Sequence, residues 1–241
     1  MKLAVLSDIH SNLEAFRRVL EDIDNQGVTE IVSLGDNVGY GPEPEAVVAL
    51  VRERGIPSVQ GNHELGLVRR KDISWFNPTA RQALRRTREL VSESSLAWCA
   101  TLPPYLVRHG CRFVHGFPPD SARLYLFACE DGEVVAAMDR IAERVCFVGH
   151  THDLELVTIS GGAVERAPLP HGPTRLDTTL RYIVNIGSVG QPRDGDNRAK
   201  YVLWEPESGL VTVRRVAYDI AVTAEKILAL GIPAQYANRL W

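Results

Sequence analysis

Acidic and histidine side chains in this sequence follow short apolar runs, a placement that is typical of a metal site. Asp8 and His10 come after the apolar residues 3–6, and Asp36 comes after residues 31–34. Because alternate residues of an extended segment share a face, Asp8 and His10 could bind one metal ion together. Asp36 is our candidate for a carboxylate that bridges two ions. Taken singly, each residue could instead belong to a structural turn or a helix entry.

Three later stretches carry candidates of the same kind. Asn62 and His63 are neighbours in one predicted loop, His115 follows another apolar run, and His150 and His152 emerge together from a fully apolar segment. The Asn62 carbonyl is a neutral oxygen ligand, although Asn62 could also cap the next helix. His63 could remain outside the metal coordination and transfer protons in the reaction. The paired imidazoles of His150 and His152 are the strongest single indication of a metal.

The donor set indicates which metals and which reaction to expect. The candidate ligands are Asp8, His10, Asp36, Asn62, His115, His150 and His152. Mixed nitrogen and oxygen donors suit Mn, Fe, Zn, Co or Ni better than Mg. We expect two divalent ions, with Mn as the first choice. Two ions roughly 3.5 to 4 Å apart can lower the pKa of a bridging water and hold phosphoryl oxygens, which predicts phosphoester hydrolysis by a metal-bridging hydroxide.

Strands and helices must bring these residues to one place. We predict strands at residues 2–6, 31–34 and 56–59, with helices between them, the first of them opened by a capping box at residues 11–14. Ligands in open α/β sheets collect at the carboxyl ends of parallel strands. Each predicted strand ends in candidate ligands, so one edge of the sheet could gather them.

The remainder of the chain departs from this alternation. We predict a helical insertion at about residues 65–102 over the site, with Asn77 and Pro78 opening one of its helices. Its arginines either face a substrate phosphate or form a solvated face; they are Arg81, Arg85, Arg86 and Arg88. A hairpin follows, turning at residues 109–110. Short strands at 155–159, 163–167, 181–186, 201–204 and 211–216 predict a second, mainly antiparallel β region within a single domain, 1–241.

Composition excludes several classes of protein. The chain has 241 residues, of which 45% are hydrophobic and 24% charged, and its formal net charge is -3. No global positive field is available to hold a polyanion, so nucleic acid binding is unsupported. The cysteines lack CxxC spacing, and the first apolar run is too short for a signal peptide or a membrane span. We therefore expect a cytoplasmic protein with reduced thiols and no membrane contact; the oligomeric state is not indicated.

Five motifs together resemble the calcineurin-like metallophosphoesterases, in particular the small bacterial and archaeal phosphodiesterases. They are DxH at residues 8–10, GD at 35–36, GNHE at 61–64, HG at 115–116 and GHTH at 149–152, and residues 185–193 also resemble a segment of that branch. The resemblance implies a four-layer αββα sandwich of two mixed β-sheets flanked by helices. It also implies one ion on Asp8, His10, Asp36 and His152, a second on Asp36, Asn62, His115 and His150, and His63 as the proton donor to the leaving group.

One departure from the family bears on the substrate. Protein phosphatases of this family continue the second motif with Asp-Arg-Gly, whereas Gly39, Tyr40 and Gly41 stand here. The carboxylate that steadies the proton-donating histidine and the arginine that holds phosphate are therefore missing. Glu64 is too close in sequence to be assumed to orient His63. Arg193 either binds phosphate or forms an ion pair with Asp194 or Asp196.

We therefore predict a phosphodiesterase acting on a small phosphoester, with a nucleotide as one option. The alternatives are a nucleotide polyphosphate hydrolase, a phosphomonoesterase or protein phosphatase, and a non-catalytic scaffold similar to a retromer subunit. Intact ligands and an intact His63 favour an enzyme.

Overall fold

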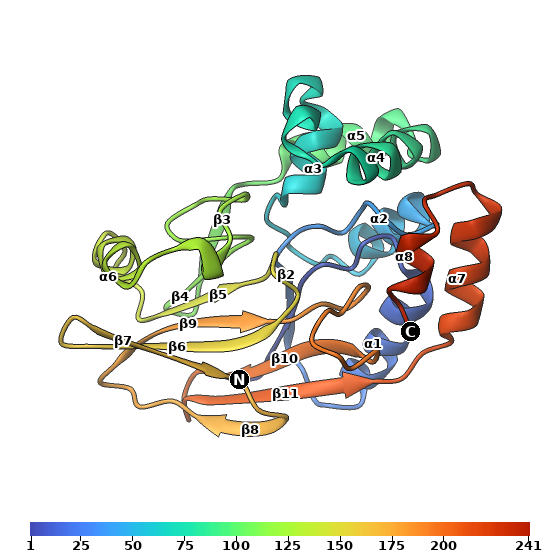
Figure 1. Cartoon of the computed structure of the whole chain (residues 1–241). Helices are drawn as coiled ribbons and strands as arrows, with labels where there is room; N and C mark the ends of the chain where they lie inside the picture. Colours follow the sequence, from blue (N-terminus) through green and yellow to red (C-terminus); the bar gives the residue numbers. More distant parts are fainter.

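Two mixed β-sheets lie face to face in the computed structural model, which describes residues 1–241 apart from the side chain of Arg70 (Figure 1). The five-stranded sheet contains, in spatial order, β2 (Glu30–Ser33), β1 (Leu3–Leu6), β10 (Ala199–Glu205), β11 (Leu210–Val216) and β8 (Gly172–Arg175). The six-stranded sheet contains β3 (Tyr105–Arg108), β4 (Cys111–Val114), β5 (Val145–Val148), β9 (Arg181–Ile186), β6 (Leu154–Ser160) and β7 (Ala163–Pro168). This arrangement confirms the predicted fold class.

Helices cover the outer faces of both sheets. The first sheet is covered by α1 (Leu13–Asp24), with α2 (Pro44–Glu53), α7 (Ile220–Ala229) and α8 (Gln235–Asn238) on the same side of the molecule in Figure 1. The second sheet is covered by α6 (Asp131–Asp139), which follows the short η2 (Leu126–Ala128). Period 2 in β1 explains the layering: Leu3 and Val5 point between the sheets, while Ala4 and Leu6 pack against α1.

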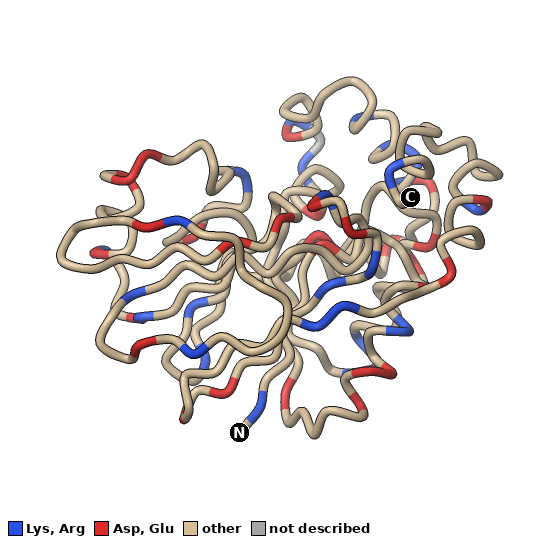
Figure 2. Tube along the Cα trace, turned by 60° about the horizontal axis from the view of Figure 1, so that its bottom comes forward, with Lys and Arg blue, Asp and Glu red and all other residues tan. Residues whose placement is uncertain are grey.

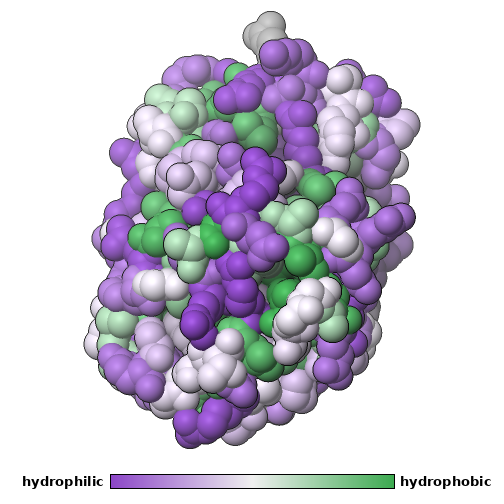
Figure 3. All heavy atoms as spheres, turned by 90° about the vertical axis from the view of Figure 1, so that its left-hand side faces the viewer, coloured by the Kyte–Doolittle hydropathy of each residue, from purple (hydrophilic) through white to green (hydrophobic). Residues whose placement is uncertain are grey.

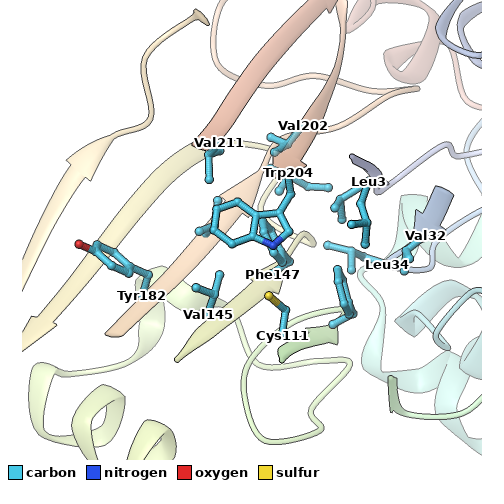
Figure 4. Packing of buried hydrophobic residues seen from close by; sticks show 14 of the residues in the cluster. Leu3, Val32, Leu34, Cys111, Val145, Phe147, Tyr182, Val202, Trp204 and Val211 are labelled. Carbon is cyan, nitrogen blue, oxygen red and sulfur yellow. The ribbon is translucent and has the colours of Figure 1, made fainter. Parts of the chain in front are cut away.

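The main core fills the space between the sheets (Figure 4). Leu3, Val32 and Trp204 of the first sheet, with Leu34 next to β2, meet Phe147 of the second sheet there. Burying one such aliphatic or aromatic side chain contributes about 1.5 to 3 kcal/mol to stability. The core therefore fixes β1, β2 and β5, and with them the loops that follow these strands.

A third group of helices stands at one end of the sandwich. It consists of α3 (Asn62–Val68), η1 (Arg70–Trp75), α4 (Pro78–Leu90) and α5 (Glu93–Thr101), at the top of Figure 1. Asn77 caps α4 and Pro78 occupies its first turn, as predicted. Arg86 donates to the Leu230 carbonyl, and Arg88 pairs with Glu93. These two contacts favour the interpretation of the arginines as a solvated helix face.

Three local predictions were wrong. Residues 56–59 form no strand, only a single bridge between Ser33 and Ser58; Pro57 has no N–H with which to extend a ladder. The N-cap of α1 is Asn12, whose side chain accepts from the Ala15 N–H, and not Ser11. The later strands do not form a separate region, because β10 pairs with β1 and β9 pairs with β5. Alternating polarity defines a buried strand face but does not specify its partner.

Charges of both signs are distributed along the described part of the chain in the view of Figure 2. Lys and Arg are interspersed with Asp and Glu in Figure 2, and the face in Figure 3 shows small hydrophobic areas separated by hydrophilic residues. None of the described helices is long and apolar enough to cross a membrane. The four cysteines are free and buried, which agrees with the expectation of structural thiols.

Candidate metal centre

The predicted ligands converge because parallel strands end at the same edges. β1 runs parallel to β2, and β4 runs parallel to β5. Asp8 follows β1, Asp36 follows β2, His115 follows β4, and His150 follows β5. Two backbone hydrogen bonds join the loops after β1 and β2. The Asp8 N–H donates to the Gly35 carbonyl at 3.1 Å, and the His10 N–H donates to the backbone carbonyl of Asp36 at 2.9 Å. The loops therefore meet as one unit.

Several site residues have a left-handed backbone, which is uncommon outside glycine. The φ angles are +55° at Asp8, +48° at His10, +50° at Asp36, and +68° at both His150 and His152. Such residues cost about 1 to 3 kcal/mol each and cluster at functional sites. They persist here because the surrounding loops are tied together; the His150 N–H, for example, donates to Asp8 Oδ2 at 2.9 Å.

The donor atoms form two groups that share one carboxylate. In the first group, His152 Nε2 lies 3.1 Å from His10 Nε2 and 3.2 Å from Asp8 Oδ1. Asp36 Oδ2 lies 3.8 Å from His10 Nε2. The same carboxylate oxygen lies 3.3 Å from His115 Nε2 in the second group.

Asn62 and His150 complete the second group. His115 Nε2 lies 3.0 Å from Asn62 Oδ1 and 3.2 Å from His150 Nδ1. Asp8, His10 and His152, and separately Asp36, His115 and His150, hold their ligand atoms within 4.8 Å of one another. The structure thus brings all seven predicted ligands together, in the two groups that the resemblance implied.

The hydrogen bonds on the far side of each imidazole test whether a metal fits. Backbone carbonyls lie at hydrogen-bond distance from one ring nitrogen of each: Val38 for His10, Leu34 for His115, Arg123 for His150 and Gln191 for His152. A carbonyl can only accept, so that nitrogen carries the proton, and in the neutral imidazole the other nitrogen presents its lone pair to the cluster. Asp8 Oδ1 is buried without a hydrogen-bond partner. Buried lone pairs that face one another in this way suit cations, so the residues fit the metals.

Protonation in the site agrees with this role. Burial lowers the pKa of His150 to about 3, with the nearby His115 adding to the effect, and lowers the pKa of His152 to about 4, with Arg193 adding to it. Burial also acts to lower the pKa of His115, but the Asp36 carboxylate outweighs it and raises the value to about 9. His150 and His152 are therefore neutral at pH 7, whereas metal binding must displace a proton from His115.

His63 belongs to neither group, although its ligand atom lies within 4.8 Å of those of His10 and Asp36. Its backbone N–H donates to Asp36 Oδ1 at 2.8 Å, and its Nε2 lies 3.9 Å from Asp36 Oδ2. Its Nδ1 is buried without a hydrogen-bond partner. The rings of Tyr40 and Phe76 contact it edge-on, with centroids at 4.3 and 5.0 Å. The two aromatic rings pack around the imidazole, and the Asp36 carboxylate faces its Nε2.

Gly39 completes the enclosure of His63. A Cβ atom on Gly39 would lie 2.8 Å from His63 Cε1, 2.9 Å from Cγ and closer still to Nδ1. The departure from Asp-Arg-Gly therefore has a structural counterpart: glycine provides the room and Tyr40 provides the contact. Sequence reasoning missed Tyr40 and Phe76, although an aromatic residue between two glycines was visible.

Glu64 has a structural role that the sequence did not reveal. Its carboxylate accepts from the backbone N–H groups of Asp36, Asn37 and Gly61 at 2.8 to 3.0 Å. Burial, with the Asp36 charge adding to it, raises the pKa of Glu64 to about 7. Glu64 thus ties the Asp36 loop to the start of α3, where the sequence had predicted a loop at Asn62, and these contacts are to backbone N–H groups.

Arg193 lies at the rim of the site. Its guanidinium contacts Gln191 Oε1 at 3.3 Å. Asp194 pairs with Lys200 and Asp196 pairs with Arg215, so the ion pairs predicted as the alternative for Arg193 are absent from the described contacts. With Arg239 and Trp241, Arg193 lines a cavity of about 400 Å³.

Comparison with known proteins places this geometry in a family. The calcineurin-like phosphoesterase superfamily domain matches residues 1–209, which include every candidate ligand. The chain belongs to this superfamily. The uncharacterized protein MJ0912 of Methanocaldococcus jannaschii is 35% identical over 246 residues, covering 99% of this chain and 97% of that protein.

Two solved structures resemble this superfamily member over its whole length. A metallophosphoesterase from Sphaerobacter thermophilus is 36% identical, with a TM-score of 0.86 and coverage of 100% of this chain and 98% of that one. The hypothetical protein PH1004 from Pyrococcus horikoshii is 19% identical, with a TM-score of 0.82 and coverage of 100% and 97%. The second match shows the fold alone.

Proposed function

We propose that this superfamily member is a phosphodiesterase that depends on two divalent metal ions. The observation that carries the proposal is the pair of donor groups sharing Asp36 Oδ2, 3.8 Å from His10 Nε2 and 3.3 Å from His115 Nε2. When bound, two such ions lower the pKa of water and neutralise phosphoryl oxygens. The mixed donors favour Mn, with Fe, Zn, Ni or Co as alternatives.

Each donor group would hold one ion. Asp8, His10 and His152 belong to the first, and Asn62, His115 and His150 belong to the second, while Asp36 serves both. The carbonyl bonds behind the imidazoles fix the orientation of each ring before any metal binds. Preorganisation of this kind raises metal affinity, and outer partners typically contribute 10- to 100-fold.

Burial lowers the pKa of His63 well below its usual range, so His63 would donate a proton to the leaving oxygen only once the negative charge of a bound phosphate raises that pKa. It completes neither donor group, yet its ring adjoins Asp36 and His10, with a centroid distance of 4.7 Å to His10. A substrate phosphate at the metals would therefore present an ester oxygen to this imidazole. Arg193, at the rim and without a carboxylate partner among the described contacts, would bind a phosphoryl oxygen.

The Gly39-Tyr40-Gly41 loop favours diesters over monoesters. A monoester is dianionic near neutral pH and gains more than a monoanionic diester from each additional cation. Protein phosphatases of this family would place an arginine in this loop, whereas here Gly39 packs against His63. A nucleotide polyphosphate hydrolase or a phosphomonoesterase remains the alternative. The buried donor atoms that face one another favour an enzyme over a non-catalytic scaffold.

Metal loading followed by a substrate comparison tests the proposal. Mn-loaded protein should hydrolyse bis(4-nitrophenyl) phosphate faster than 4-nitrophenyl phosphate, and a chelator should abolish both reactions. Asp36→Asn should lose activity and both ions. Asp139→Asn is the matched control, because its side chain is exposed on α6. Two bound ions without hydrolysis of any phosphoester would instead support the scaffold.

A further inference from the structure

A ladder of nearly parallel aromatic rings stands beside His150. The Tyr125 ring lies 3.9 Å from the His150 ring at 14°, and the Phe127 ring lies 4.9 Å from that of Tyr125 at 19°. Trp75 lies 6.2 Å from Tyr125 at 19° and 6.0 Å from His150 at 26°. We call Trp75, Tyr125 and Phe127 the aromatic platform.

The platform is exposed where large apolar rings are usually covered. Trp75 is 41% exposed and Phe127 is 67% exposed. They come from separate segments, since Trp75 ends η1 and Phe127 lies in η2. A group of flat apolar rings that is exposed to solvent next to a polar centre is typical of a ligand-binding surface.

The two segments are fastened together, so the platform is formed in advance. Arg123 and Asp72 make an ion pair at 2.7 Å between the segments. The Arg123 carbonyl also lies 3.2 Å from His150 Nε2, and Leu126, between Tyr125 and Phe127 in the sequence, is fully buried. A ligand that stacks on the platform therefore loses little free energy to ordering the protein.

We propose that the aromatic platform stacks the nucleobase of a phosphoester substrate, so that the substrates are nucleotide diesters. This inference rests on the proposed function, because a phosphate at the metals would lie beside His150 and would direct its substituent onto the rings. Arg193 contacts the side chain of Gln191, whose backbone carbonyl lies at hydrogen-bond distance from His152, so a cation lies close to the expected phosphate. Parallel rings suit a planar partner, and every base has a face to stack.

Stacking should provide affinity with little preference among bases. Base stacking on an aromatic side chain contributes about 1 to 3 kcal/mol, which corresponds to about 5- to 150-fold in affinity. The rings of Trp75 and Phe127 offer no pattern of acceptors with which to distinguish bases. Adenosine and cytidine monophosphates should therefore bind within about an order of magnitude of each other.

Calorimetry on the metal-loaded protein tests this without requiring turnover. Adenosine 5′-monophosphate and ribose 5-phosphate share the phosphate and the sugar and differ in the base. The nucleotide should bind about 5- to 150-fold more tightly. Trp75→Leu should reduce that ratio several-fold with ribose 5-phosphate unchanged, and Trp75→Phe should restore most of it. Leu228→Ala, exposed on α7, is the control and should change neither affinity.

Three outcomes would overturn the inference. They are equal affinities for the two ligands in the parent protein, a ratio that Trp75→Leu leaves intact, and a loss of affinity for both ligands alike. Failure of the proposed function gives a different result. A base-dependent affinity without hydrolysis of any diester would support base stacking on the platform and contradict the phosphodiesterase activity. Hydrolysis of bis(4-nitrophenyl) phosphate without base dependence would support the activity and contradict base stacking.

Discussion

Gly39→Ala should disable His63 without touching a metal ligand. The new methyl group would lie 2.8 Å from His63 Cε1 and 2.9 Å from Cγ, which is too close for carbon atoms, so the ring must move. A general acid contributes about 10²- to 10⁴-fold in rate. At 1.36 kcal/mol for each factor of ten, the variant should lose about 3 to 5 kcal/mol of transition-state stabilisation on an alkyl diester.

The choice of leaving group separates this effect from general damage. An alkoxide needs a proton in order to leave, whereas nitrophenolate does not, so hydrolysis of bis(4-nitrophenyl) phosphate should fall much less. His63→Gln should give the same pattern with both metals retained. Because the two changes act through one ring, the double variant should be no slower than His63→Gln alone. Metal content and thermal melting are measured alongside the rates.

Gly27→Ala provides the matched control. Gly27 also has a positive φ, +65°, but an added Cβ there would meet no atom within 4 Å. Gly27→Ala therefore places an alanine at a positive φ, as Gly39→Ala does, but without a collision with a neighbouring side chain. Unchanged hydrolysis of the alkyl diester by Gly39→Ala would refute our account of what positions His63. Equal losses on both substrates would instead assign His63 to stabilising charge on the phosphoryl group.

Three further predictions follow from individual contacts. Asn62→Ala should weaken one metal-binding event and leave the other tight, because Asn62 contacts only the His115 group; two equally weakened events in a titration would contradict the division of ligands. The ratio of kcat/KM for a nitrophenyl diester to that for a phosphoserine peptide should exceed one, and faster peptide turnover would restore the protein phosphatase alternative. Burial acts to raise the pKa of Asp22, but hydrogen bonds from Arg214 and Tyr201 outweigh it and lower the value; the stability this adds is present above the unfolded pKa of about 3.9 and is lost as the pH falls through the folded pKa. Asp22→Asn should therefore reduce the pH dependence of the free energy of unfolding, measured with urea between pH 6 and 3. An unchanged pH dependence would show that these bonds do not stabilise the fold.

Most of the ligand residues could be predicted from sequence because they follow short buried strands, whereas Asn62 opens α3 without a strand before it. Runs such as residues 145–148 are recognisable, and parallel strands must end at a common edge. His150 and His152 were thus accessible to local reasoning. The division of the later strands between two sheets was not, because β10 is buried on both faces and its sequence leaves open whether β1 or β9 is its neighbour.

Features that depend on contacts between residues far apart in the sequence could not be predicted. Tyr40 and Phe76 meet at His63 from positions 36 residues apart in the sequence. Glu64 acts through backbone N–H groups, which leave no pattern in the sequence. The aromatic platform joins residues from η1 and η2. The wrong prediction of a strand at residues 56–59 could have been avoided, because Pro57 in the sequence argues against a strand there.

Anomalous scattering from a crystal of the Mn-loaded protein tests the central claim most directly. The account predicts two peaks roughly 3.5 to 4 Å apart, with Asp36 between them, His10 and His152 beside one, and His115 and His150 beside the other. A single peak, or two peaks that do not share Asp36, would contradict it.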